Sequence, residues 1–260
     1  MNLDLKDKVI LVSGGAKGIG AAIVKMLAAE QAFPIIIGRN QTDNEKLLKE
    51  IRLLNYNADY QTAELTQPGS CKIVVDDVLK KYGRIDGIVN NAGVNDSIGL
   101  ETGNDEDFIA SLHKNLVHYY SLVHHALPAL KKSKGTIVNI GSKTADTGQG
   151  GTSGYAAANG GRNALTREWA VELLPFEIRV NAVIVAEAMT PLYQKWLDTF
   201  DDPEGKLKMI TQKIPLEKRM TKTEEIANMV VFLLSKRSSH TTGQLIYVDG
   251  GYVHLDRAIT

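Results

Sequence analysis

Short apolar runs alternate with longer amphipathic stretches along almost the whole chain. The runs are rich in β-branched residues, and several are apolar without interruption, which is typical of strands covered by helices on both faces. They predict strands over 9–12, 35–37, 59–62, 87–89, 135–140, 179–184 and 245–248. This alternation indicates repeated βα units built on a parallel sheet of seven strands.

The longer stretches have the spacing of helices that bury one face. Ile19, Ile23, Met26 and Leu27, for example, recur at helical intervals in the first stretch. The pattern predicts helices over 18–29, 44–54, 70–82, 105–130, 153–174 and 223–234. Since no repeat or Pro/Gly/Ser linker interrupts this order, we expect one α/β domain, residues 1–260, with a doubly wound parallel sheet.

One stretch, residues 185–215, lacks a regular pattern. It contains several prolines and a glycine around apolar and aromatic residues, including Tyr193 and Trp196. Irregular segments of this length inside a compact domain are often functional. We therefore expect an irregular segment that acts as a lid over the substrate.

Composition and charge exclude several classes of partner. The 30 Lys and Arg residues balance the 30 Asp and Glu residues, so no broad basic surface is expected for nucleic acid or an anionic membrane. Cys71 is the single cysteine and cannot form an internal disulfide. Because no apolar run approaches the roughly 20 residues of a membrane span and no signal peptide is recognisable, we expect a cytoplasmic protein.

A small-residue loop at residues 13–20 joins the first strand to the first helix. Small residues there let the backbone approach a pyrophosphate, whose charge is met by amides at the helix N-terminus. The glycines, Gly14, Gly18 and Gly20, depart from the GxGxxG spacing, so the position after a strand carries the argument. The loop predicts a dinucleotide site and hence a Rossmann-type sheet.

The loop after the second strand distinguishes the two nicotinamide cofactors. An acid there would bind the ribose 2′-hydroxyl of NAD, whereas Arg binds a 2′-phosphate. This chain has Arg39 and Asn40 and no carboxylate at the strand end, and Lys17 is expected nearby. We therefore expect NADP(H) to be preferred and NAD(H) to be possible.

Six separated motifs, spread over essentially the whole chain, resemble those of the short-chain dehydrogenase/reductase family. Residues 13–20 resemble its TGxxxGIG loop, with Ser in place of Thr, and residues 90–93 match its NNAG motif. The remaining matches are Asn115, Ser142, Tyr155, 181–183, Thr190 and 249–251. The resemblance implies a cofactor site of Gly14, Ala16, Lys17, Gly18, Ile19, Gly20, Arg39, Asn40, Glu64, Leu65, Asn91, Ala92, Gly93, Tyr155, Asn159, Ala188 and Thr190.

The resemblance also implies the catalytic roles. Tyr155 corresponds to the acid/base of hydride transfer, Ser142 to the residue that holds the substrate oxygen, and Asn115 to the residue that fixes a helix kink and a water relay. A free tyrosine has a pKa of about 10, so a tyrosine base that works near neutral pH needs a nearby positive charge. In the family, a lysine one helical turn further on supplies that charge.

Asn159 stands where the family has this lysine. An amide can bind a ribose hydroxyl but brings no charge, so we expect slow chemistry and better-preserved cofactor binding. Lys143 and Arg162 are two cations that could substitute in part, and oxidised nicotinamide itself favours a phenolate. Surface or subunit-contact roles for Lys143 and Arg162 are the alternative.

The substrate side is polar. In the loop after the sixth strand, Glu187 suits a polyol better than an acyl chain, and the pattern resembles the sugar-oxidising members, closest to L-fucose dehydrogenases, as does the tail at 254–257. A solvated loop acid and a turn residue are the alternatives for Glu187 and Asp96. The predicted substrate residues are Asn95, Asp96, Lys143, Gln149, Glu187, Tyr193 and Trp196.

These expectations define one leading function and two alternatives. The leading function is oxidation of an aldose hydroxyl, as in L-fucose, to the lactone. A 3-oxoacyl reductase and a cofactor-binding protein with little catalysis are the alternatives. The histidines show no metal-ligand spacing, so no metal is expected. The resemblance further implies a homodimer or homotetramer formed through the helices at 105–130 and 153–174.

Overall fold

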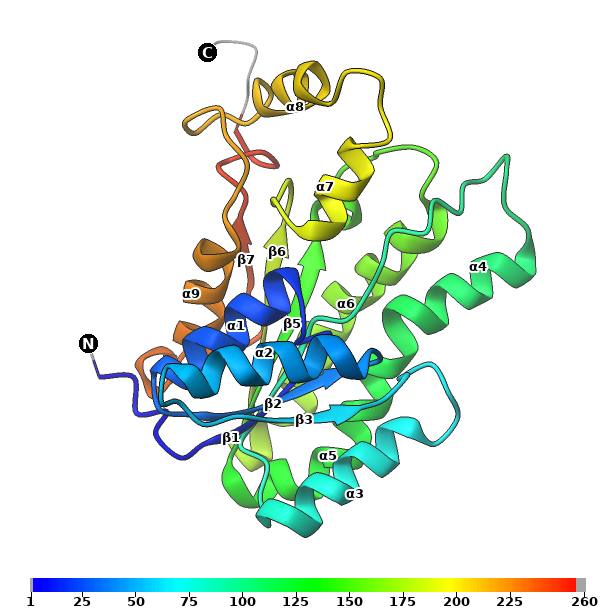
Figure 1. Cartoon of the computed structure of the whole chain (residues 1–260). Helices are drawn as coiled ribbons and strands as arrows, with labels where there is room; N and C mark the ends of the chain where they lie inside the picture. Colours follow the sequence, from blue (N-terminus) through cyan, green and yellow to red (C-terminus); the bar gives the residue numbers. More distant parts are fainter. Residues whose placement is uncertain (1, 256–260) are drawn as a thin grey trace.

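A computed structural model describes residues 2–255 of the chain. Seven parallel strands form one sheet in the order β3-β2-β1-β4-β5-β6-β7, as expected for a doubly wound Rossmann-type fold (Figure 1). The strands are β1 (Val9–Ser13), β2 (Phe33–Gly38), β3 (Asp59–Thr62), β4 (Gly87–Asn90), β5 (Thr136–Ser142), β6 (Arg179–Val185) and β7 (Leu245–Val248). Each lies within one or two residues of its predicted position.

Helices cover both faces of the sheet (Figure 1). Outside residues 185–215 the helices are α1 (Gly18–Ala29), α2 (Gln41–Leu53), α3 (Ser70–Tyr82), α4 (Asp105–Leu112), α5 (His118–Ser133), α6 (Ser153–Glu172) and α9 (Thr223–Leu234). Short 3₁₀ turns occur at Lys143–Ala145, Leu174–Phe176 and Lys236–Ser238. The described chain therefore follows the predicted βα order.

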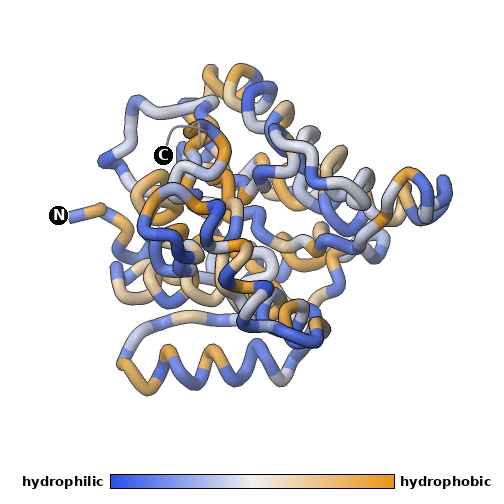
Figure 2. The backbone as a smooth tube through the Cα atoms, turned by 90° about the horizontal axis from the view of Figure 1, so that it is seen from above, coloured by the Kyte–Doolittle hydropathy of each residue, from blue (hydrophilic) through white to orange (hydrophobic). Residues whose placement is uncertain are grey.

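Alternation along the strands explains the two hydrophobic layers. On β1, Ile10 and Val12 join the cluster formed with α1, α2 and α9, whereas Val9 and Leu11 join the cluster formed with α3, α5 and α6. Successive side chains on a strand point to opposite faces, so a continuously apolar strand stabilises both layers. In Figure 2 the surface helices, by contrast, alternate between hydrophilic and hydrophobic residues.

The helix predicted over 105–130 is interrupted. A π-helical turn, His113–Val117, separates α4 from α5 and contains Asn115. A π turn changes the backbone hydrogen-bonding pattern and is frequent at functional sites. The apolar spacing carries no sign of the extra residue and predicted a continuous helix, whereas the family resemblance assigned a helix kink to Asn115, where the π turn lies.

The segment predicted to be irregular contains two helices, α7 (Pro191–Leu197) and α8 (Pro203–Thr211). Pro191 and Pro203 begin these helices, and in the first turn the N–H that proline lacks is not needed. Thr190 and Asp202 cap these helices, accepting hydrogen bonds from Tyr193 N and Gly205 N. The expected irregularity was wrong because prolines that begin helices resemble prolines that break them. Both helices lie beyond the ends of β5 and β6 (Figure 1).

Within residues 2–255, none of the helices combines the length and the apolar character needed to span a bilayer. The same residues contain no group of three or more His, Cys, Asp or Glu side chains arranged to hold a metal ion.

Candidate active site

A cleft of about 390 Å³ opens at the carboxyl ends of the central strands, beside the point where the strand order reverses between β1 and β4. Ligands of doubly wound sheets bind at this position. Of the residues predicted for the site, those that line the cleft are Gly14, Lys17, Gly18, Ile19, Asn91, Ala92, Gly93, Asn95, Ser142, Tyr155, Ala188, Thr190 and Tyr193. The glycine loop, the NNAG loop and the catalytic hydroxyl groups thus share one cavity.

Ser13 fixes the glycine loop against the loop after β4. Its buried Oγ accepts hydrogen bonds from Asn91 N at 2.9 Å and Ala92 N at 3.0 Å. Asn91 Nδ2 donates in return to Ser13 O and Gly14 O, at 2.9 and 3.2 Å. These four bonds join the ends of β1 and β4, so the cleft floor is built before any ligand arrives.

Gly14 has a φ of +62°, in the left-handed region that side chains disfavour. A Cβ at this position would lie 3.0 Å from both Ala92 Cα and Asn91 Nδ2. The loop therefore needs glycine here both for its backbone conformation and for its close approach to the neighbouring loop.

The N-terminus of α1 suits an anion. No side chain caps this helix, and its first turn contains no acidic residue. Its first amides and the positive end of the helix dipole are therefore available to a phosphate group. Together with the glycine loop, this arrangement fits the pyrophosphate of a dinucleotide.

The cations predicted to recognise a 2′-phosphate are exposed and paired. Lys17 Nζ lies 2.6 Å from Asp43 Oδ2, and Arg39 Nη1 lies 3.6 Å from Glu64 Oε2. Asn40 caps α2 by accepting a hydrogen bond from Asp43 N. Ala16, Gly20, Arg39, Asn40, Glu64 and Leu65 do not line the cleft.

Ser142 and Tyr155 reach the cleft from different elements. Ser142 ends β5, and its Oγ accepts a hydrogen bond from Thr144 Oγ1 at 3.2 Å. Tyr155 lies in the first turn of α6 and is half-buried. Asn115 does not line the cleft: its Oδ1 accepts from Val94 N at 2.8 Å and its Nδ2 donates to Ser111 O at 3.0 Å.

Asn159 does not line the cleft, although it stands at the family's lysine position. Its side chain is fully buried, with Nδ2 donating to Tyr155 O at 2.8 Å and Oδ1 accepting from Arg162 Nη1 at 3.1 Å. Arg162 does line the cleft. The sequence offered it only as one of two cations near Tyr155, and its spacing of seven residues on the same helix was the signal.

The substrate side contains a compact polar cluster. Lys143 is 8% exposed and forms an ion pair with Glu187 Oε1, while Tyr193 OH donates to Glu187 Oε2 at 2.7 Å. Lys143 Nζ also lies 4.2 Å from the centre of the Tyr252 ring. Burial and the Glu187 carboxylate raise the pKa of Tyr193, so this phenol stays protonated and donates.

Of the predicted substrate residues, Asn95 and Tyr193 line the cleft, whereas Asp96, Lys143, Gln149, Glu187 and Trp196 do not. Asp96 accepts a hydrogen bond from Ser111 Oγ at 2.8 Å and pairs with Lys114 at 3.4 Å, so it ties its loop to the α4–α5 segment. Gln149 is exposed, and Trp196 stacks edge-on against Tyr193 and Phe200. In the predicted tail motif, Asp256 and Arg257 lie outside the described residues.

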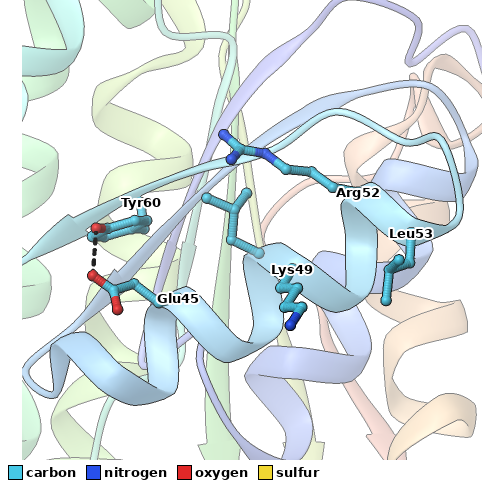
Figure 3. Close-up of a pocket in the computed structure, with 6 residues that line it drawn as sticks. Glu45, Lys49, Arg52, Leu53 and Tyr60 are labelled. Atoms are coloured by element: carbon cyan, nitrogen blue, oxygen red, sulfur yellow. Dashed lines mark hydrogen bonds between the residues drawn. The ribbon is translucent and has the colours of Figure 1, made fainter.

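A second hollow lies against α2, away from the predicted active-site residues. Figure 3 shows Glu45, Lys49, Arg52, Leu53 and Tyr60 around it, with Tyr60 OH donating to Glu45 Oε1 at 3.1 Å. Its lining shares no residue with the cleft at the strand ends.

Three lining residues, Val94, Ile140 and Gly141, were not predicted as part of the site. Of the others not named individually, Val185, Ala186, Pro191 and Leu192 belong to the segment predicted as the lid, and Arg162 was offered as a substitute cation. Most of them are small or apolar residues adjacent to a predicted one, and a single sequence gives no signal that separates such residues from ordinary core positions.

Comparison with known proteins agrees with this geometry. Residues 14–253 match the family described as enoyl-(acyl carrier protein) reductase. The 3-oxoacyl-[acyl-carrier-protein] reductase FabG of Thermotoga maritima is 36% identical over 250 residues, which cover 96% of this chain and 99% of that protein. L-fucose dehydrogenase of Rattus norvegicus is 31% identical over 245 residues, which cover 94% and 88% of the two chains.

The crystal structure of the Cj0485 dehydrogenase has a TM-score of 0.94 and 44% sequence identity, and the match covers 99% of this chain and 98% of that one. The chain belongs to the short-chain dehydrogenase/reductase family, whose members are oxidoreductases that use NAD(P)(H).

Proposed function

We propose that this protein oxidises a hydroxyl group of an aldose, of the L-fucose type, to the lactone, with NADP⁺ preferred over NAD⁺. The observation that carries the proposal is the cleft that joins the glycine loop to Ser142, Tyr155 and Tyr193. The cofactor fits because Gly14 leaves space where a Cβ would be crowded and because α1 begins without a cap. The similarity to L-fucose dehydrogenase supports a sugar as the substrate.

The bound cofactor supplies the hydride acceptor. The chain's own residues manage the substrate oxygen and its proton: the Ser142 hydroxyl binds that oxygen, and Tyr155 accepts the proton as the carbonyl forms. Asn115 Oδ1 holds Val94 N and so positions the loop that follows β4 at the cleft. The α7 segment, which contributes Pro191, Leu192 and Tyr193 to the lining, acts as the lid.

The polar cluster favours a sugar over an acyl chain. The carboxylate of Glu187, held by Lys143 and Tyr193, offers hydrogen-bonding groups that match a polyol. The hydroxyl groups of a sugar can form further hydrogen bonds with these charged and polar groups, whereas an acyl chain can form none.

The preference for NADP(H) rests on Arg39 and Lys17. Both cations are exposed, and the Arg39 contact with Glu64 is long at 3.6 Å, so the Arg39 side chain can turn to a phosphate. Lys17 would have to exchange its ion pair with Asp43 for the phosphate. Glu64 and Asn40 remain proposed cofactor contacts in the same region.

Two alternatives make different predictions. The identity to FabG favours a 3-oxoacyl reductase, and the burial of Asn159 away from the cleft favours a cofactor-binding protein with little turnover. The test is a fluorescence titration with NADPH and NADH, run beside a panel of aldoses with NADP⁺ and NAD⁺ and an acetoacetyl thioester with NADPH. Turnover of aldoses supports the proposal. Turnover of the thioester alone, or tight binding with no turnover, would contradict it.

We also propose that the protein is cytoplasmic and assembles as a homodimer or homotetramer through α4, α5 and α6. Ile109, Val117 and Tyr120 are apolar or aromatic residues exposed along the α4–α5 segment, and a partner subunit would cover them. Sedimentation velocity tests the assembly, and a monomer at micromolar concentration would contradict it.

A further inference from the structure

Arg162 is a buried charge held in one orientation. Its side chain is 3% exposed, although it lies in the middle of α6. Nε donates to Asn115 O at 2.7 Å, and Nη1 donates to Ile140 O and to Asn159 Oδ1, both at 3.1 Å. The guanidinium also stacks on the Tyr119 ring, 4.3 Å from its centre. Four neighbours thus fix both the position and the plane of this group.

Each of these neighbours is electrically neutral. Asn115 and Ile140 contribute backbone carbonyls, and Asn159 contributes an amide. Among residues 2–255, no carboxylate forms an ion pair with Arg162. A buried charge without a counter-charge is strongly unfavourable, so a structure that builds such a precise cradle for it implies an anionic or strongly polar partner that is not part of the resting fold.

One nitrogen of the guanidinium is left for such a partner. Nη2 is buried and has no hydrogen-bond partner in the described structure, and Arg162 lines the cleft. A Cβ on Gly93 would lie 2.8 Å from Nη2, so the glycine of the NNAG loop leaves room for this atom beside the cleft. The guanidinium carbon lies 6.0 Å from the centre of the Tyr155 ring.

The titratable groups around Arg162 carry no competing charge near neutral pH. Burial, and then the charge of Arg162, lower the pKa of His118 to about 4. Burial raises the pKa of Tyr119 to about 12. On the substrate side, Lys143 and Glu187 are paired with each other. The field at Tyr155 from this side of the cleft is therefore set by Arg162.

We propose that Arg162 is the cationic residue of this active site: its Nη2 donates to the nicotinamide ribose of the bound cofactor, and its charge stabilises the Tyr155 phenolate. Asn159 then holds Nη1 in place. The positive charge of the site lies three residues further along α6 than the position at which the sequence resemblance placed it. This inference rests on the proposed dehydrogenase function.

A cycle of charge variants tests the assignment. Arg162→Gln removes the charge, and Asn159→Lys combined with Arg162→Gln moves it to position 159. Asn159→Lys alone places two cations together, and Arg167→Gln removes an exposed charge from the same helix as a matched control. Fluorescence titration gives the NADPH dissociation constant of each variant, and thermal melting confirms folding.

The expected result has three parts. Arg162→Gln weakens NADPH binding by about tenfold or more, the effect of a lost charge-assisted hydrogen bond, and moves the acidic limb of the pH profile of kcat to higher pH by about one unit or more. The double variant Arg162→Gln/Asn159→Lys restores the NADPH dissociation constant to within about threefold of wild type. It also returns the acidic limb of the pH profile to within about 0.5 pH unit of wild type. Asn159→Lys alone lowers the melting temperature without raising kcat, and Arg167→Gln changes neither quantity.

The opposite results overturn the inference. An Arg162→Gln variant that folds, binds NADPH as tightly as wild type and keeps its pH profile would exclude the role. If Arg162→Gln does not fold, the double variant decides, because a folded double variant that binds NADPH at least tenfold more weakly would also exclude it. The NADPH titration needs no substrate, so it stays informative if every aldose fails and the proposed function is wrong.

Discussion

The Lys143–Glu187 pair gives the sharpest prediction about the substrate side. Both side chains are largely buried, with 10% and 13% of their surface exposed, and the Tyr193 hydroxyl donates to the second carboxylate oxygen. Glu187→Gln keeps the shape and an acceptor for Tyr193, but it leaves the Lys143 ammonium without its counter-charge.

The size of the effect follows from burial. Breaking a fully buried ion pair costs about 3–5 kcal/mol because one charge remains unpaired. Since about a tenth of each side chain stays in water, we expect a loss of about 2–3 kcal/mol in the free energy of unfolding, which lowers Tm by about 5–10 °C in a protein of this size.

Thermal unfolding of the apoprotein measures this loss, and the Lys72–Asp76 pair on α3 is the control. Those side chains are 60% and 57% exposed, so Asp76→Asn should cost at most about 0.5 kcal/mol. Glu187→Gln should also raise the KM for the aldose while NADPH affinity stays within about twofold. A Glu187→Gln variant as stable as Asp76→Asn, with an unchanged KM, would refute this reasoning.

Removing both charges separates stability from recognition. Lys143→Met combined with Glu187→Leu leaves no unpaired charge, so part of the lost stability should return, although the Tyr193 hydroxyl loses its acceptor. The KM for the aldose should remain high, because the hydrogen-bonding groups are gone. Recovery of both quantities would contradict a role of the cluster in sugar binding.

Three further predictions concern other parts of the molecule. Gly14→Ala should weaken NADPH binding at least about tenfold, whereas Gly160→Ala, where the added Cβ meets nothing within 4 Å, should not; equal titrations would contradict the loop's role. Arg39→Gln should weaken NADPH about tenfold and leave NADH unchanged, and equal losses would exclude a phosphate contact. The pKa of His118 is about 4 in the fold, because of burial and then Arg162, against about 6.5 when unfolded. The unfolded chain therefore binds this proton first as the pH falls, and up to about 3 kcal/mol of stability present above pH 6.5 is lost between pH 6.5 and 4. Urea unfolding across this pH range should show the loss, and in His118→Gln this pH dependence should disappear.

The fold could be predicted closely because its signals are local. The buried strands are continuously apolar, and the glycine loop marks the first strand-to-helix junction. The apolar pattern did not predict the π turn around Asn115, which only the family resemblance indicated as a kink, or the helices that begin at Pro191 and Pro203. An inserted residue leaves the apolar spacing almost unchanged. The sequence alone does not distinguish a proline that begins a helix from one that prevents a helix.

In the site, too, some residues could be placed from the sequence and others could not. Ser142 and Tyr155 could be placed because their motifs are specific, and both line the cleft. The orientation of Asp96 depends on Ser111, which belongs to another element. The orientation of Asn159 depends on Arg162, a near neighbour on α6 that is itself held by Asn115 from a distant part of the sequence. Sequence spacing puts a residue on the correct side of a helix, but it does not tell which hydrogen-bond partners that side chain will choose.

The central claim is that one cleft holds the nicotinamide nucleotide and that Tyr155 handles the substrate proton there. Tyr155→Phe tests it most directly, by NADPH titration and steady-state turnover on the same preparation. We predict that kcat falls by about 10²–10⁴-fold while the NADPH dissociation constant stays within about threefold. Turnover at the wild-type rate in the Phe variant would contradict the account.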